Sequence, residues 1–211
     1  MRVVRGLMAL VAAMLLATVP IGVGWSSAAA ETPPTLPGVP ASVTVQAWLT
    51  FDLEGDYQWQ STKLQAGSSS IGTIQVHHGF LIATDSAVEV SDPAFGIRQV
   101  PAGGAMAMGE GQQIEVTAPA GSSRLMFVEL VAKGGAFENE QPDSVKTFTV
   151  PKGRYTLAVL AVPGGANAPS AGSVVAKAAA PAIAVYPEGS TATPGATSGN
   201  PYWLVALFPA V

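Results

Sequence analysis

Residues 80–108, FLIATDSAVEVSDPAFGIRQVPAGGAMAM, decide the fold class of this chain. The stretch contains short runs of β-forming residues, and a turn signal with Pro, Gly or Asp separates each run from the next. The runs are residues 80–84, 87–90, 97–100 and 105–108. Many short strands punctuated by turns are typical of a sandwich or a barrel. The stretch therefore predicts an all-β fold.

The same pattern continues on both sides of this stretch. Over residues 43–53 every second residue is apolar, which predicts a strand with one buried and one solvated face. Residues 145–150 and 154–162 are predicted to form a hairpin around the turn signal Pro151-Lys152-Gly153. Other short strands are expected at residues 57–64, 71–76, 112–117 and 124–132, and no amphipathic helix is expected.

The composition excludes several classes of protein. The chain has 211 residues, of which 11% are charged, with 10 Lys and Arg against 14 Asp and Glu and no Cys. The 23 Gly and 17 Pro residues are too many for a helical bundle. The acidic balance argues against a nucleic-acid partner, and the lack of Cys excludes disulfides and thiolate metal sites.

Residues 1–30 have the three parts of a secretory signal peptide. Arg2 and Arg5 precede an apolar segment, and small residues follow it up to Ala30. We expect cleavage near Ala30, which makes the mature chain secreted, periplasmic or exposed at the cell surface, with no stable membrane span. The alternative, a transmembrane anchor, is disfavoured because Pro and Gly interrupt the apolar segment.

The remaining chain divides into four segments by composition. Residues 31–41 form a Pro-rich lead-in, and residues 42–162 contain the strands of one core domain. Residues 163–201 are rich in Ala, Gly, Pro and Ser, so we expect a loosely structured wrap or linker there. Residues 202–211 are too apolar to stay in water and too short to span a bilayer, which predicts a strand that returns to the core.

Between residues 64 and 130, Gly67 and Gly103 each begin a series of positions with a motif-like spacing. Gly67 precedes Thr73, Gln75, Gly79 and Ser86, and Gly103 precedes Gly109, Gly111, Ile114 and Ala118. These spacings resemble the two motifs of the cupins, G-x5-H-x-H-x3-E-x6-G and G-x5-P-x-G-x2-H-x3-N. The resemblance implies a cupin-like jelly-roll barrel, with an immunoglobulin-like β-sandwich as the alternative.

The resemblance covers the scaffold of the family and not its metal ligands. Cupins hold a metal with three His and one Glu, and the matching positions here are Thr73, Gln75, Ile114 and Gly79. Ile114 and Gly79 have no side-chain donor atom. We therefore expect no metal and no cofactor. His77 is a weak alternative ligand, because it and His78 are neighbours on a strand and point to opposite faces.

Two groups of residues are candidates for ligand binding. Gln75, His77, Met106 and Met108 would line the barrel interior, where Met offers flexible apolar filling. Trp48, Tyr57 and Trp59 form the aromatic concentration of the chain and could stack on sugar rings. The alternative for both groups is ordinary packing in the core or at its edge.

These observations favour an exported, non-catalytic cupin-like protein with a small-ligand-binding or structural role. One alternative is a degenerate cupin enzyme that uses His77 with a metal. The other is a carbohydrate-binding or cell-surface module that uses Trp48, Tyr57 and Trp59. The expected partner is a small molecule or glycan, and a homodimer paired through edge strands is compatible with the family.

Overall fold

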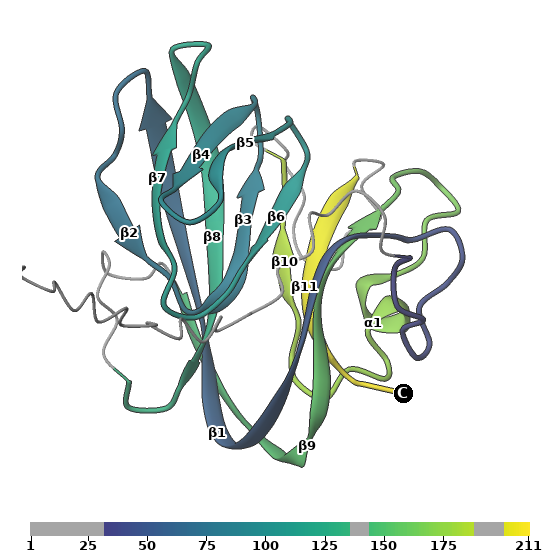
Figure 1. The fold of residues 1–211 in the computed structure, drawn as a ribbon. Helices are drawn as coiled ribbons and strands as arrows, with labels where there is room; N and C mark the ends of the chain where they lie inside the picture. The colour runs from purple at the N-terminus through teal and green to yellow at the C-terminus, as the bar shows by residue number, and fades with distance from the viewer. Residues whose placement is uncertain (1–31, 136–143, 188–200) are drawn as a thin grey trace, which may run out of the picture. The chain divides into compact units, whose positions relative to one another are not determined.

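The residues that the computed structural model describes are 32–135, 144–187 and 201–211, and they form eleven β-strands and one helical turn (Figure 1). This confirms the predicted all-β fold. The predicted signal peptide, residues 1–30, lies outside the described residues. Within the described ranges, no helix is long and apolar enough to cross a membrane.

Eight strands form two sheets in which the first strand pairs with the last, the second with the next to last, and so on inward. They are β1 (Thr44–Gly67), β2 (Thr73–Gln75), β3 (His78–Ala83), β4 (Val88–Asp92), β5 (Gly96–Val100), β6 (Ala105–Met108), β7 (Gln113–Thr117) and β8 (Ser122–Ala132). β1 pairs with β8, β2 with β7, β3 with β6 and β4 with β5, all antiparallel. The resulting orders, β1-β8-β3-β6 and β2-β7-β4-β5, are those of a rolled-up hairpin, the eight-stranded jelly roll. The immunoglobulin-like alternative is wrong, because that sandwich orders its strands differently.

Three further strands extend the first sheet beyond β1. They are β9 (Ser144–Val162), β10 (Ile183–Val185) and β11 (Tyr202–Pro209), in the order β10-β11-β9-β1. The hairpin predicted around Pro151-Lys152-Gly153 is wrong, because β9 is one continuous strand along β1. At that point two residues of β9 stand opposite Glu54, which makes a β-bulge. Proline is tolerated at a bulge, so its turn signal marks a bend in a strand.

A second bulge, at Gln46 in β1, changes which face the strand buries. Val45 and Ala47 pair with consecutive residues of β9, so Gln46 is the inserted residue. Val43 and Val45 consequently pack in a different apolar cluster from Ala47. The prediction that every second residue of 43–53 shares one face is therefore wrong for Val43 and Val45, because an inserted residue reverses the alternation.

The apolar core has three layers. The first lies between the two jelly-roll sheets and includes Leu81. The second joins the other face of β8 and β3 to β9 and β11, and includes Phe80 and Leu207. The third lies on the far face of β9 and β11, beside α1 (Ala171–Val174), and includes Phe208. Strands between two layers are buried on both faces, as β11 is, which confirms the predicted C-terminal core strand.

The described part of the C-terminal segment, residues 163–187, packs against these strands. Val174 and Ile183 are buried, and Trp59 Nε1 donates a hydrogen bond to the carbonyl oxygen of Pro181 over 2.8 Å. The expectation of loose structure therefore does not hold for this part. Residues 188–200 lie outside the described residues.

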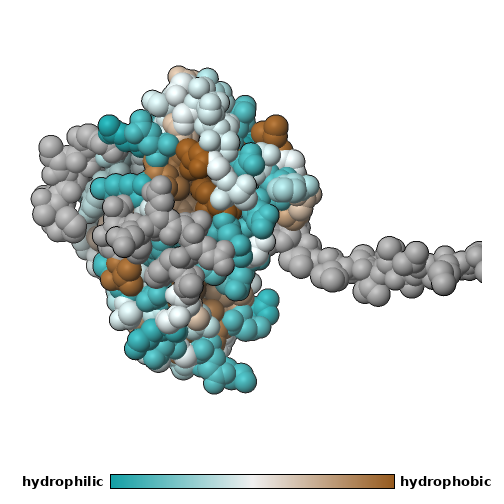
Figure 2. All heavy atoms as spheres, turned by 90° about the vertical axis from the view of Figure 1, so that its left-hand side faces the viewer, coloured by the Kyte–Doolittle hydropathy of each residue, from teal (hydrophilic) through white to brown (hydrophobic). Residues whose placement is uncertain are grey.

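The outer face of the four-stranded sheet carries polar side chains on β7, whereas Ile97 on β5 is a 70% exposed apolar residue. On β7, Ile114 and Val116 are buried in the jelly-roll core, whereas Gln113 and Glu115 are exposed. On the side where β2 and β7 lie in Figure 1, hydrophilic and neutral residues predominate and the hydrophobic patches between them are small (Figure 2).

Candidate functional site

The interior of the jelly roll is where the cupin resemblance implies a site. Ile74 is buried there and pairs directly with the buried Ile114, whereas Thr73 and Gln75 are exposed. Because neighbours on a strand point to opposite faces, Thr73 and Gln75 point away from the interior. The assignment of Gln75 to the barrel lining is therefore wrong, and the interior at this position is aliphatic.

Gly79 on β3 stands where the resemblance implies the Glu ligand, and the backbone of β8 closes this position. A Cβ atom added to Gly79 would collide with the carbonyl oxygen of Val128 and lie 3.0 Å from Cα of Glu129. β8 itself brings a carboxyl group to the interior, because Glu129 alternates along the strand with the core residues Leu125 and Phe127. Sequence reasoning missed Glu129, although this alternation could have revealed it.

Glu129 is a buried carboxyl group with a polar neighbour. It is 1% exposed, and its Oε1 accepts a hydrogen bond from the backbone N–H of His77 over 2.9 Å. Gln60, also 1% exposed, lies directly opposite in the β1–β8 pairing, and its Oε1 has no hydrogen-bond partner. Burial raises the pKa of Glu129, and the hydrogen bond from His77 only partly opposes this. Burial therefore makes this carboxyl group harder to ionise than an exposed glutamate.

The two histidines do not form a metal site with these groups. The ring of His78 stacks on Phe51 with centroids 4.2 Å apart, and its Nε2 lies 3.5 Å from Glu110 Oε2. Burial lowers the pKa of His78, against the opposing effect of Glu110. His77 is half-buried beside Glu129. In the part of the chain that the structure describes, no group of three or more His, Cys, Asp and Glu side chains is placed to hold a metal ion.

Met106 and Met108 fill the jelly-roll core. Met108 is fully buried in the layer between the two sheets, and Met106 is half-buried against the same layer. Both therefore lie on the inward face that the sequence indicates, in contact with the aliphatic residues around them. They act as filling there, together with Ile74 and Ile114.

Trp48, Tyr57 and Trp59 do not form an exposed aromatic platform. Trp59 is 0% exposed, and its ring lies against Phe148 with centroids 5.5 Å apart. Tyr57 packs against the same layer of the core, whereas Trp48 packs against the third layer, on the far face of β9. The three rings therefore do not form the predicted sugar-stacking site together, because Trp59 is buried and Trp48 lies on the opposite face of β1 from Tyr57 and Trp59.

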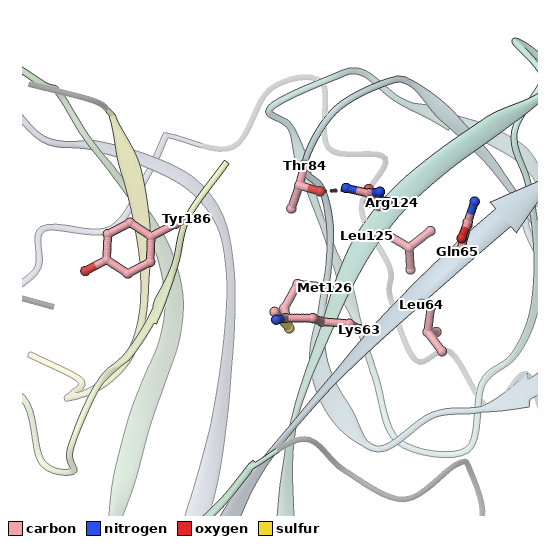
Figure 3. A pocket seen from close by; sticks show the side chains of 8 residues that line it. All are labelled: Lys63, Leu64, Gln65, Thr84, Arg124, Leu125, Met126 and Tyr186. Carbon is pink, nitrogen blue, oxygen red and sulfur yellow. Dashed lines mark hydrogen bonds between the residues drawn. The ribbon is translucent and has the colours of Figure 1, made fainter. Parts of the chain in front are cut away.

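A cleft of about 340 Å³ lies on the opposite side of β1 and β8 from the jelly-roll interior (Figure 3). Its lining comprises Lys63, Leu64, Gln65, Thr84, Arg124, Leu125, Met126 and Tyr186. Leu64 and Leu125 turn their side chains into the jelly-roll core, so the paired backbone of β1 and β8 forms the floor of the cleft. Tyr186, which directly follows β10, also lines the cleft, but its ring stacks on Tyr202 and points away from Met126 (Figure 3).

Cross-strand pairing brings four of the lining side chains onto one face. Lys63 pairs with Met126, and Gln65 pairs with Arg124. Directly opposite residues of an antiparallel pair share a face, so these side chains form a two-by-two patch. Figure 3 shows Lys63 and Met126 side by side, toward Tyr186.

The loop after β3 fixes the Arg124 edge of this cleft. Thr84 Oγ1 donates a hydrogen bond to the carbonyl oxygen of Arg124 over 2.9 Å, and the backbone N–H of Arg124 donates to Asp85 Oδ1 over 2.8 Å. Asp85 also accepts a hydrogen bond from the hydroxyl of Ser123 over 3.0 Å. Desolvation raises the pKa of Asp85, but these hydrogen bonds outweigh it and hold the pKa below its ordinary value.

Sequence reasoning did not identify the cleft. Its residues come from β1, β8, the loop after β3 and the chain after β10, which meet only in the folded protein and share no local motif.

Comparisons with known proteins give a limited result. No protein-family model and no curated protein matches this chain. Among solved structures, protein NMB1881 from Neisseria meningitidis is 17% identical, with 40% of this chain and 82% of that chain covered and a TM-score of 0.30. A putative ethanolamine utilization protein EutQ from Salmonella typhimurium is 16% identical (41% and 71% covered, TM-score 0.31), and the Clostridium difficile EutQ protein is 10% identical (42% and 70% covered, TM-score 0.31). These proteins have the cupin fold. At such TM-scores the jelly-roll assignment rests on strand order alone.

Proposed function

We propose that this chain is an exported, non-catalytic protein that binds a small molecule in the cleft over β1 and β8. The observation that carries the proposal is the contrast between two places in the fold. The jelly-roll interior is filled by buried side chains such as Ile74, Met108 and Ile114. The cleft is about 340 Å³, within the usual range for small-molecule sites, and its floor of paired strand backbone is flanked by the side chains of Lys63, Gln65 and Met126.

The residue types of the cleft suit binding better than catalysis. Among the described residues, its lining has no His, Cys, Asp or Glu, the side chains that most often act as general bases or nucleophiles. The carboxyl group that faces the interior, Glu129, is fully buried and bonded to the backbone of His77. Of the residues that the structure describes, a ligand in the cleft would therefore meet the charged, amide and hydroxyl groups of Lys63, Gln65 and Thr84.

The export part of the proposal is supported by the signal-peptide pattern of residues 1–30. N-terminal sequencing of the full chain after expression in a secreting bacterial host tests this part. We expect the exported protein to begin at or near Glu31. Cell-associated protein that keeps residues 1–30 would contradict it.

A screen of small soluble fragments by ¹⁵N–¹H NMR tests the binding site. We expect the shifted amides to cluster at residues 63–65, 84, 124–126 and 186. Met126→Trp fills the cleft and should abolish these shifts, whereas Ile97→Trp, at a position on β5 that is 70% exposed, should leave them unchanged. Shifts centred on Ile74 and Ile114, or none with any fragment, would contradict the proposed site.

A further inference from the structure

We infer that two copies of this chain form a homodimer in which β6 of one copy pairs antiparallel with β6 of the other, with Met106 on the twofold axis. The inference goes beyond the proposed function and does not depend on the cleft. It depends on which sheet edge is open, on the backbone groups along that edge and on the side chains beside it.

The two sheets end in four edge strands, and β6 differs from the other three. In the described residues, the seven-stranded sheet ends at β10 and β6, and the four-stranded sheet ends at β2 and β5 (Figure 1). Pro181 and Pro187 flank β10, and β5 carries Arg98; proline and charge both protect an edge from pairing. β2 presents the exposed polar side chains of Thr73 and Gln75. β6 has none of these features, because it consists of alanine and methionine only.

Hydrogen bonds at the start of β6 show which way its backbone groups point. Gly103 N–H donates to the carbonyl oxygen of Ala83 over 2.8 Å, and Ala83 N–H donates to that of Gly104 over 3.0 Å. Directly opposite residues of an antiparallel pair alternate between hydrogen-bonded and non-hydrogen-bonded pairs. Leu81 and Met106, two residues further along each strand, are therefore again a hydrogen-bonded pair. Met106 thus directs its N–H and C=O groups toward β3.

Ala105 and Ala107, on either side of Met106, direct their N–H and C=O groups to the open edge. In residues 32–135, 144–187 and 201–211, β6 pairs with β3 only, and no turn or loop hydrogen bond uses these groups. A row of such groups on an edge strand is a template for another strand.

A twofold axis through Met106 satisfies these groups together. Ala105 then stands opposite Ala107 of the second copy, and Ala107 stands opposite Ala105 of that copy. Each alanine pair is a hydrogen-bonded pair, which exchanges both N–H···O=C bonds. Met106 faces Met106 of the second copy between them.

The side chains beside the axis are apolar on both faces of the sheet. Ala105 and Ala107 pack against the second core layer, and Met106 packs against the jelly-roll core. In the dimer, alanine would meet alanine on one face and methionine would meet methionine on the other. No charged residue lies between Arg98 and Glu110, so the axis brings no like charges together, although the protein as a whole is acidic. The segment is therefore complementary to itself, which favours a second copy as its partner.

Two measurements on the chain after signal removal test the inference. Sedimentation velocity from about 1 μM to about 1 mM protein should show an equilibrium between monomer and dimer. Hydrogen exchange followed by ¹⁵N–¹H NMR should locate the interface. We expect the amide protons of Ala105 and Ala107 to exchange at least about tenfold more slowly where the dimer predominates, and that of Ile97 on β5 to be unchanged.

Variants separate β6 from the other edges. Met106→Lys places two ammonium groups opposite each other on the axis, whereas in the monomer its stem can pack while its charge reaches water. Ala107→Pro removes an outward N–H group, at a kind of position where edge strands tolerate proline. Each should raise the dissociation constant of the dimer by at least about tenfold. Ile97→Lys adds the same charge at a 70% exposed position and should change it by less than about twofold.

The outcomes that would overturn the inference are distinct. A chain that stays monomeric at about 1 mM would do so. A dimer of unchanged affinity in a β6 variant whose NMR spectrum shows it to be folded would also do so. Should neither variant fold, exchange rates of Ala105 and Ala107 in the wild type that do not depend on protein concentration would contradict pairing through β6.

Discussion

Glu129 illustrates how a single residue links the interior of the jelly roll to solution conditions. Its carboxyl group is buried opposite Gln60, and burial raises its pKa. Gln60 Oε1, on the residue directly opposite, has no hydrogen-bond partner, and only the protonated form of Glu129 has a proton to offer while it accepts the hydrogen bond from His77 N–H. An ionised carboxylate can only accept the hydrogen bond from His77 N–H. The protonated form therefore suits this site better than the ionised form.

The raised pKa predicts a pH dependence of stability with a definite sign. The folded state holds the proton of Glu129 more tightly than the unfolded state does. The free energy by which this proton stabilises the fold is therefore complete below the ordinary pKa of Glu and is lost as pH rises through the folded-state pKa. Glu129→Gln supplies a permanent donor and acceptor. We expect it to raise the free energy of unfolding by about 1–3 kcal/mol at alkaline pH and by progressively less toward pH 5, as measured by urea denaturation.

Two comparisons make this prediction specific. Glu115→Gln, on the exposed face of β7, is the same substitution and should give no pH-dependent difference. His77 is the titratable neighbour of Glu129, so the measurement is repeated in a His77→Asn background to remove its charge. A stability difference for Glu129→Gln that stays constant from pH 5 to 9 would show that Glu129 does not titrate as expected.

At the scale of single residues, the sequence does not determine the register of a strand, and therefore does not determine which of its side chains point inward. Glycine spacing leads to Thr73 and Gln75, but the structure buries Ile74 and exposes its neighbours. A shift of one residue exchanges the two faces of a strand, and the length of the turn after Gly67, which sets that shift, cannot be read from spacing alone. The alternation of Glu129 with Leu125 and Phe127, in contrast, is visible in the sequence.

At the scale of elements, β1 and β9 contain two bulges, one of which the sequence presents as a turn signal. Leu53 and Gly55 flank the register shift opposite Pro151-Lys152-Gly153, and Gly55 has φ of 106°. Residues other than glycine rarely adopt this backbone conformation, however much free space surrounds them. The glycine at this bend is therefore a requirement of the backbone, since a Cβ there would meet no atom within 4 Å.

Gly55→Ala should destabilise the protein by about 1–3 kcal/mol, because alanine is strained at this φ. The matched control is Gly172→Ala in α1, where φ is not positive and a Cβ also meets no atom within 4 Å. That change should be neutral or slightly stabilising. Both are measured as free energies of unfolding in urea. Equal effects of the two substitutions would mean that backbone strain at the bulge is not the cause.

β11 is the element on which the second and third core layers both depend. Its side chains alternate between these layers, and it pairs with β9 along its whole length. Deletion of residues 202–211 should therefore abolish cooperative thermal unfolding, whereas deletion of Val211, which is fully exposed, should leave the melting temperature unchanged. A truncated chain that melts like the full one would contradict the role of β11.

At the scale of the whole molecule, local patterns predict the all-β fold and the C-terminal core strand, and the family resemblance predicts the jelly roll. They do not predict that β9, β10 and β11 extend the jelly-roll sheet. That extension depends on pairs such as Tyr57 with Phe148, far apart in the chain, and on bends in two long strands. The cleft over β1 and β8 follows from this extension, because Tyr186 reaches it only from the end of β10.

The metal content of the purified protein tests the proposal that it is non-catalytic and binds no metal. The positions that the family resemblance assigns to metal ligands hold two outward polar side chains, a glycine closed by β8 and the buried Ile114. We therefore expect no stoichiometric metal after incubation with zinc, manganese, iron or nickel and dialysis, as measured by elemental analysis. His77→Ala, treated in parallel, separates weak binding at that ring from a true site. Stoichiometric metal that disappears in His77→Ala would favour the degenerate-enzyme alternative, because it would require ligands that join His77 through a rearrangement of the interior.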